Sequence, residues 1–265
     1  MVRALAAGTA VAIVLGGAAR DATPSVWERQ QAATPLPTLQ RLIAFGRPVY
    51  CAGPHGNAIA LTFDDGPGPY TPVALRILRR AHDRATFFVV GKLLAQRRSF
   101  VRKELRFGDV GDHTWTHRDL ELLAPTEAGR EITRTSLALR ELTRRRVVFF
   151  RPPYGARNAT IDAIARRLGL LEILWTIDSR DSEGADPAQI AAAVESARPG
   201  AIVLLHENRG QTLKGLLWEH ALAALRARHL RAVSLTQLLT TDPPSRAQLA
   251  KGPRGCGIAH VSHGG

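Results

Sequence analysis

The chain has 265 residues, of which 45% are hydrophobic, and its 36 lysines and arginines outnumber 23 acidic residues to give a formal net charge of +13. This composition supplies enough apolar side chains for a globular core and excludes an intrinsically disordered chain. The positive charge favours anionic partners, but no nucleic-acid-binding motif accompanies it, so we expect no nucleic acid among the partners.

The first twenty residues indicate a targeting segment. The basic start Met1-Val2-Arg3 precedes an apolar run from Ala4 to Ala19. The run has the length of a signal-peptide hydrophobic region and is marginally short for a membrane-spanning helix. We therefore predict a signal peptide or an N-terminal membrane anchor over residues 1–20, with the rest of the chain secreted or attached to the extracellular side of the cell envelope.

Apolar runs alternate with amphipathic segments over most of the remaining chain. After a linker at 21–56 with room for one short helix, β-branched and aromatic runs predict strands, and segments with helical spacing follow them. The predicted strands are 58–61, 85–90, a short segment near 109–111, 147–150, 171–177, 201–205 and a short one near Val233. The predicted helices are 71–81, 92–107, 125–144, 159–168, 187–197, 218–228 and one that ends at Leu239.

About seven alternations of strand and helix predict an α/β fold with parallel strands, and a barrel explains that number better than two domains do. We expect one domain over residues 57–240, followed by a flexible tail over 241–265. The two cysteines, Cys51 and Cys256, flank this domain. An oxidising compartment would allow them to form a disulfide, but the sequence does not decide whether they come close together.

Unusual polar residues follow the predicted strands. In a parallel barrel these positions share one rim, so residues far apart in sequence would converge. They are Asp64, Asp65, His113, His117, Arg151, Asp178, Asp181 and His206.

Three of these positions suggest a metal site. His113 and His117 are four residues apart, a spacing that puts both imidazoles on one face of a helix. With one carboxylate of the Asp64-Asp65 pair they would form a site with open coordination positions. Zinc, cobalt, nickel and iron all fit this ligand set.

The other polar positions suggest acid–base chemistry. Two prolines after Arg151 fix its backbone, so its guanidinium is expected to pair with a carboxylate, and Asp64 is the recipient if Asp65 binds the metal. His206 ends an apolar strand and is a candidate proton donor. Its acidic partner is Asp181 or Asp178, which the spacing alone does not separate.

Five stretches occur in the order of the motifs of the polysaccharide deacetylase family, whose NodB-like domain defines carbohydrate esterase family four, and the chain resembles that family. The stretches are TFDDGP (62–67), HTWTH (113–117), RPPYG (151–155), DSRD (178–181) and LLH (204–206). The resemblance extends from residue 57 to about 240 and implies a deformed (β/α) barrel with about seven parallel strands. It also implies metal-dependent removal of acetyl groups from a sugar polymer.

The resemblance implies roles for individual residues. Asp64 would be the general base, oriented by Arg151, and His206 the general acid, supported by Asp181. The implied ligands of a divalent metal ion are Asp65, His113 and His117; we expect Zn²⁺, with Co²⁺ or Ni²⁺ as alternatives. The implied substrate-binding residues are Tyr154 through its backbone N–H, Leu204 beside the acetyl group, and Pro152.

Two positions depart from the family pattern. Ser182 stands where the family commonly has a tryptophan, which opens one wall of the expected cleft. Trp115 and Trp218 are the candidates to replace that wall. Glu207 after His206, where aspartate is frequent, is a milder change.

We predict that the chain is a monomeric extracellular hydrolase that removes N-acetyl groups from a polysaccharide containing N-acetylglucosamine, such as peptidoglycan or chitin. Two alternatives stay open. One is an O-acetyl esterase acting on xylan-type glycans, and the other is a glycan-binding barrel without turnover.

Overall fold

The computed structural model describes residues 37–208 and 216–258, all of which belong to the unit Thr34–Gly265. The predicted leader at 1–20 lies outside these residues. None of the described helices combines the length and the hydropathy that crossing a membrane requires.

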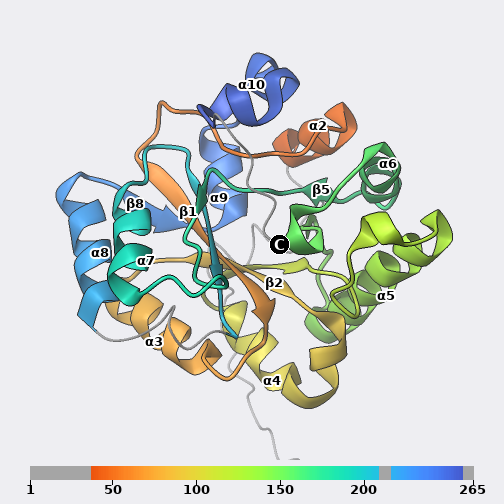
Figure 1. Cartoon of the computed structure of the whole chain (residues 1–265), viewed down its shortest axis with the longest axis horizontal. Helices are drawn as coiled ribbons and strands as arrows, with labels where there is room; N and C mark the ends of the chain where they lie inside the picture. Colours follow the sequence, from red (N-terminus) through yellow and green to blue (C-terminus); the bar gives the residue numbers. More distant parts are fainter. Residues whose placement is uncertain (1–36, 209–215, 259–265) are drawn as a thin grey trace, which may run out of the picture. The chain divides into compact units, whose positions relative to one another are not determined.

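Eight strands form one sheet in the described part of the chain, and every strand pair in it is parallel (Figure 1). The order is β5-β4-β3-β2-β1-β7-β6, and β8 pairs with the first residues of β1. This confirms the predicted deformed barrel of parallel strands. The strands are β1 (Ala58–Gly66), β2 (Ala85–Val89), β3 (Gly108–Asp112), β4 (Phe149–Phe150), β5 (Leu171–Glu172), β6 (Ile177–Asp178), β7 (Ile202–His206) and β8 (Arg231–Val233).

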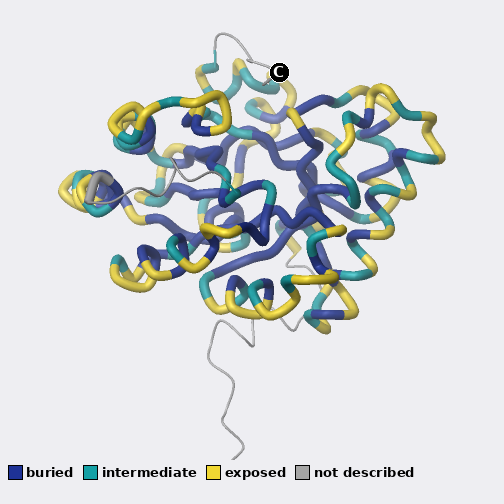
Figure 2. The backbone as a smooth tube through the Cα atoms, turned by 60° about the horizontal axis from the view of Figure 1, so that its bottom comes forward, coloured by how far each residue is buried: buried dark blue, intermediate teal, exposed yellow. Residues whose placement is uncertain are grey.

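Helices surround the sheet, and the strands form the buried centre (Figures 1 and 2). Several helices begin as their sequences suggest: proline opens α3, and Asn158 and Asp186 cap α6 and α7 through their side chains. The α-helices are α2 (Pro37–Phe45), α3 (Thr71–Ala81), α4 (Leu94–Glu104), α5 (Pro125–Thr143), α6 (Ala159–Arg167), α7 (Pro187–Glu195), α8 (Leu216–Ala227), α9 (Leu235–Thr241) and α10 (Arg246–Lys251). Short 3₁₀ helices are η1 (Gly91–Leu93), η2 (Leu120–Leu122), η3 (Pro153–Gly155) and η4 (Gly252–Cys256).

The alternation of side chains along β1 separates two apolar clusters. Ile59, Leu61 and Phe63 belong to the cluster that includes residues of α3, α4 and α5, whereas Ala60 belongs to a second cluster with residues of α2 and α9. Because successive residues of a strand point to opposite faces, Asp64 is in phase with Ala60. The same alternation that builds the core therefore directs Asp64 to the inner face.

The predicted strand 171–177 is two strands in the structure. β5 ends at Glu172 and β6 begins at Ile177, and they are the two ends of the sheet order. Residues 173–176 therefore connect the two edge strands of the sheet. The segment around Val49 lies beside them: its N–H donates to the Glu172 carbonyl at 2.9 Å and its carbonyl accepts from Leu174 N–H at 2.8 Å.

The predicted linker and tail contain ordered structure. The linker includes α2, and part of the predicted flexible tail forms α10 and η4, so the prediction of a flexible tail is wrong for these residues. A disulfide joins Cys51 to Cys256 across 205 positions of the sequence, and Leu249 of α10 is buried. Covalent attachment and apolar burial explain why a Gly- and Pro-containing stretch is held in place.

Candidate active site

The two adjacent aspartates stand at the carboxyl end of β1. Asp64 is paired in register with His206 of β7. Between Phe63 and Gly66, β1 has one residue more than β2, and Asp65 has a φ of 67°. A bulge of this kind re-aims side chains at a strand end. Both carboxylates consequently line one cleft although they are neighbours in sequence.

The two histidines are close together as predicted, but the predicted helix is absent from this segment. Residues 113–117 form a bend in which Thr114 and His117 both have a φ of 64°. Asp112 holds this bend by accepting Thr114 N–H at 2.8 Å and the Ser136 hydroxyl at 2.6 Å. Burial raises the pKa of Asp112 to about 8. The imidazole centroids of His113 and His117 are 4.9 Å apart.

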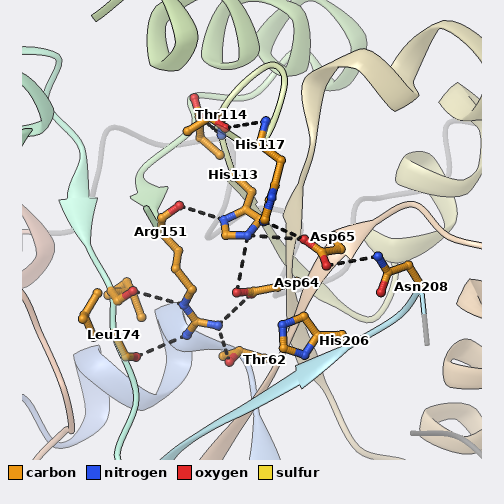
Figure 3. A network of polar contacts seen from close by, with 12 residues as sticks. Thr62, Asp64, Asp65, His113, Thr114, His117, Arg151, Leu174, His206 and Asn208 are labelled. Carbon is orange, nitrogen blue, oxygen red and sulfur yellow. Dashed lines mark hydrogen bonds and ion pairs between the residues drawn. The ribbon is translucent and has the colours of Figure 1, made fainter. Parts of the chain in front are cut away.

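Asp65 and the two histidines point toward one another (Figure 3). Asp65 Oδ1 lies 3.0 Å from His117 Nε2 and 3.6 Å from His113 Nε2, and the three candidate ligand atoms are within 4.8 Å of one another. Burial alone would raise the pKa of Asp65, but the imidazoles of His117 and His113 lower it well below its usual range. Asn208 Nδ2 donates to the other carboxylate oxygen at 3.0 Å.

The donor atoms in this cluster fit a divalent cation. His113 Nδ1 is 2.8 Å from the Arg151 carbonyl, which only accepts, so Nδ1 carries the proton and Nε2 presents a lone pair. Burial also lowers the pKa of His113 to about 4, which keeps the ring neutral at pH 7. Asp65 Oδ1 is buried, and its near neighbours among the described residues are the Nε2 atoms of His117 and His113, neither of which has hydrogen-bond geometry toward it. A cation would satisfy this oxygen.

Arg151 is fully buried and pairs with Asp64, as predicted from the sequence. Its Nη1 lies 2.8 Å from Asp64 Oδ1, and the guanidinium stands 4.3 Å above the Phe88 ring. Further donations go to the Thr62 hydroxyl at 2.8 Å and to the Leu174 carbonyl at 3.2 Å (Figure 3). Asp64 therefore has a fixed and fully buried cationic partner at the edge of the cleft.

Asp181 contacts His206 twice. One carboxylate oxygen lies 2.6 Å from His206 Nδ1, and the other accepts the His206 backbone N–H at 2.7 Å. Burial alone would lower the pKa of His206, but the hydrogen bond and charge of Asp181 raise it to about 9. Asp178, the alternative from the sequence, instead accepts the Arg180 backbone N–H at 2.8 Å. The structure therefore selects Asp181 as the partner of His206.

These groups line a cleft of about 450 Å³, a volume suited to a small ligand or one sugar unit of a chain. Tyr154, Leu204 and Ser182 line it as well, and the Tyr154 ring packs 4.9 Å from the His117 ring, between centroids. Pro152 is buried and is not among the lining residues.

The aromatic wall of the cleft differs from the one expected. Trp115 lies under the Arg134 guanidinium at 3.8 Å, and Trp218 is buried against Phe63, so neither lines the cleft. Trp175 does line the cleft. Its ring packs against Gly155, so closely that a Cβ at position 155 would lie 2.9 Å from the ring. Sequence reasoning missed Trp175 because it lay inside a run predicted as one buried strand.

Comparisons with known proteins agree with this geometry. The family model described as polysaccharide deacetylase matches residues 52–173. A chitooligosaccharide deacetylase of Bradyrhizobium sp. is 34% identical over 69% of this chain and 90% of its own length. A peptidoglycan-N-acetylglucosamine deacetylase of Listeria monocytogenes is 35% identical over 68% of this chain. Among solved structures, a family 4 carbohydrate esterase from Streptomyces lividans in complex with acetate matches with a TM-score of 0.63 and 33% identity, over 69% of this chain and 92% of that one.

Some relatives are much longer. The chain spans 38% of the length of the Listeria protein. A bifunctional xylanase/xylan deacetylase of Cellvibrio japonicus is 33% identical over 56% of this chain, and the match covers 23% of that protein.

Proposed function

Because the chain belongs to the polysaccharide deacetylase family, we propose that it is a metal-dependent hydrolase that removes N-acetyl groups from an extracellular polysaccharide containing N-acetylglucosamine. The observation that carries this proposal is the convergence in one cleft of three sets of groups. They are the Asp65–His113–His117 cluster, the Asp64–Arg151 pair and the His206–Asp181 pair. Each set matches a separate requirement of amide hydrolysis.

Asp65, His113 and His117 would hold the metal ion. Two imidazole nitrogens and one carboxylate favour Zn²⁺, with Co²⁺ and Ni²⁺ as alternatives. When bound, the ion would supply Lewis acidity toward the acetyl carbonyl and the attacking water. The neutral His113 ring, whose Nδ1 proton is committed to a carbonyl, is already in the tautomer that ligation requires.

The remaining groups would move protons. Asp64, held by Arg151, would take a proton from water as the oxygen attacks the acetyl carbonyl carbon. The backbone N–H of Tyr154 would donate to the oxyanion that develops on the carbonyl oxygen. His206 would then donate its proton to the sugar nitrogen as the C–N bond breaks, releasing acetate and an amine. A pKa of about 9 keeps His206 protonated at neutral pH, and an amine leaves only when it is protonated.

Two features support an extracellular site of action. One is the predicted leader over residues 1–20, and the other is the Cys51–Cys256 disulfide, because disulfides persist in oxidising compartments. We propose residues 57–240 as the catalytic domain, with the disulfide attaching its flanking segments.

The test is acetate release from N-acetylglucosamine oligomers and from peptidoglycan by the purified full chain. We expect release that is abolished by EDTA, restored by Zn²⁺ and absent in Asp64→Asn, which keeps the shape of the side chain. O-acetylated xylo-oligosaccharides, run in parallel, separate an N-deacetylase from an O-acetyl esterase. Acetate release that persists in both EDTA-treated protein and Asp64→Asn would refute the proposal, and polymer binding without any acetate would favour an inactive glycan-binding barrel.

A further inference from the structure

The two sides of the cleft carry opposite charges. Lys92 of η1 and Arg97 of α4 line it on the side of β2, whereas Asp178 and Glu183 line it on the side of β6. β2 and β6 are separated in the sheet by β1 and β7, so these residues approach a bound chain from opposite sides.

The carboxylates of the acidic side already accept hydrogen bonds from the protein. Glu183 Oε2 accepts from Arg180 Nε at 2.8 Å, and Asp178 accepts the backbone N–H of Arg180 at the same distance. A ligand that approaches this side meets one carboxylate in an ion pair, that of Glu183, and one held by a backbone N–H, that of Asp178.

The basic side differs in this respect. Within the described ranges 37–208 and 216–258, neither Lys92 nor Arg97 has a carboxylate at ion-pair distance, and Lys92 Nζ donates only to the Thr116 carbonyl, at 3.3 Å. The next arginine, Arg98, is different: it lies outside the cleft lining and pairs with Glu141 at 3.8 Å. Arg97 is half-buried and presents a planar group that can bind a carboxylate through two hydrogen bonds.

The basic residues are attached to the candidate metal site. Gly91 N–H donates to the Thr114 carbonyl and Lys92 N–H to the Trp115 carbonyl, both at 2.9 Å. Lys92 thus lies against the segment that carries His113 and His117. An anion bound by Lys92 and Arg97 would therefore belong to the same glycan chain as the acetyl group in the cleft.

We propose that Lys92 and Arg97 bind a carboxylate of the substrate, so that the enzyme prefers a glycan whose sugars carry acid groups beside N-acetylated sugars. This inference rests on the proposed function, because it names the class of polymer for the same cleft. A lactyl ether acid, or a peptide attached through it, would supply the carboxylate, and neutral chitin would not. The net charge of +13 would favour approach of such an anionic polymer.

The experiment compares substrates of one length that differ in charge. The acid substrate is a tetrasaccharide of alternating N-acetylglucosamine and N-acetylmuramic acid with free lactyl carboxylates, and its methyl ester is the neutral match. We expect kcat/KM for acetate release to be about tenfold higher for the acid than for the ester, as for one charge-assisted contact in a partly dry site. A third substrate carries L-alanine on the lactyl carboxyl, which moves the negative charge outward. If its kcat/KM exceeds that of the free acid, the site binds a peptide carboxylate; if it is lower, the site binds the lactyl carboxylate.

Arg97→Met is the test variant and Arg98→Met is its matched control, since both remove one positive charge from α4. Arg97→Met should lose most of the preference for the acid over the ester, because the guanidinium that binds the carboxylate is gone. Arg98→Met should keep the full preference, and thermal unfolding checks that both variants are folded.

Equal kcat/KM for acid and ester in the wild-type protein, or an undiminished preference in Arg97→Met, would overturn the inference. Absence of acetate from every substrate would instead refute the proposed function. In that event, calorimetric binding of the acid and ester tetrasaccharides decides the matter: tighter binding of the acid that depends on Arg97 supports the carboxylate site, and equal binding refutes it.

Discussion

Arg151→Met would keep most of the side-chain volume at the end of β4 but remove every donor of the guanidinium. In the wild-type protein these donors serve Asp64, the Thr62 hydroxyl and the carbonyls of Ile173 and Leu174, at 2.8–3.2 Å. Removing one partner of a buried ion pair costs about 3–5 kcal/mol, because the other charge stays buried without compensation. Each carbonyl that loses its donor adds about 1 kcal/mol. We therefore expect the free energy of unfolding to fall by about 5–7 kcal/mol.

A double-mutant cycle isolates the pair from the other losses. Asp64→Asn alone leaves the guanidinium charge of Arg151 buried, whereas the double variant removes both charges. The double variant should therefore be more stable than the sum of the single losses predicts, with a coupling energy of at least about 2 kcal/mol. Urea unfolding at pH 7 with EDTA measures this, since the chelator removes any stabilisation by a bound metal ion.

Additive single losses, or a loss of less than about 1 kcal/mol in Arg151→Met, would show that Arg151 and Asp64 are not a strongly coupled buried pair. An exposed pair provides the contrast. Arg98 and Glu141 are 3.8 Å apart and largely in solvent, so Arg98→Met should change stability by less than about 1 kcal/mol.

Three further predictions concern the metal cluster, the acid and the disulfide. Zn²⁺ added to EDTA-treated wild-type protein should raise its melting temperature by several degrees, and the same addition should not do so for His117→Ala, because one of three ligands is gone; equal shifts would contradict the site. Asp181 raises the pKa of His206 to about 9, so a protonated general acid is present below that pH and is lost as the pH rises through it. Asp181→Asn should move this loss of kcat/KM to lower pH, and a basic limb that does not move would exclude His206 as the acid. The Cys51→Ser/Cys256→Ser double variant should lose up to about 5 kcal/mol in urea unfolding, as the loop-closure estimate gives for a bond that spans 205 positions, and an unchanged midpoint would show that the bond adds nothing.

Most of the candidate site could be predicted because its polar residues directly follow predicted strands. A parallel sheet brings strand ends to one edge whatever the strand lengths, so Asp64, Arg151 and His206 could be placed together without knowledge of any loop. The choice of Asp181 over Asp178 could not be made in this way. It depends on the turn after β6, where Asp181 reaches both the ring and the backbone of His206.

The sequence predicted correctly that the rings of His113 and His117 lie close together, but it predicted the wrong backbone conformation. Helical spacing predicted that the two rings lie close, but the structure brings them together through left-handed backbone at Thr114 and His117. Asp112 accepts Thr114 N–H and Thr114 accepts His117 N–H at 3.1 Å, and these local bonds replace helical ones. Neither bond leaves a hydrophobic period in the sequence, so no pattern could have revealed the bend.

The break between β5 and β6 has the largest consequence for the site. A run of apolar residues cannot show where a strand ends if the chain stays buried past its end. Because the chain leaves the sheet after Glu172, the carbonyls of Ile173 and Leu174 become free to accept from Arg151, and Trp175 reaches the cleft. The interruption therefore supplies both part of the arginine's binding site and the aromatic wall.

Arg151 acts on the site through two separate groups. Its guanidinium holds Asp64, while its backbone carbonyl fixes the tautomer of His113. The N–H of Arg151 in turn donates to the Asp112 carbonyl at 3.0 Å, beside the bend that carries the histidines. One residue thus sets the spacing between the proposed base and a proposed metal ligand, and the following prolines restrict its backbone. Because a side-chain substitution leaves the carbonyl in place, Arg151→Met separates the two functions: it releases Asp64 and leaves the lone pair of His113 directed at the cation site.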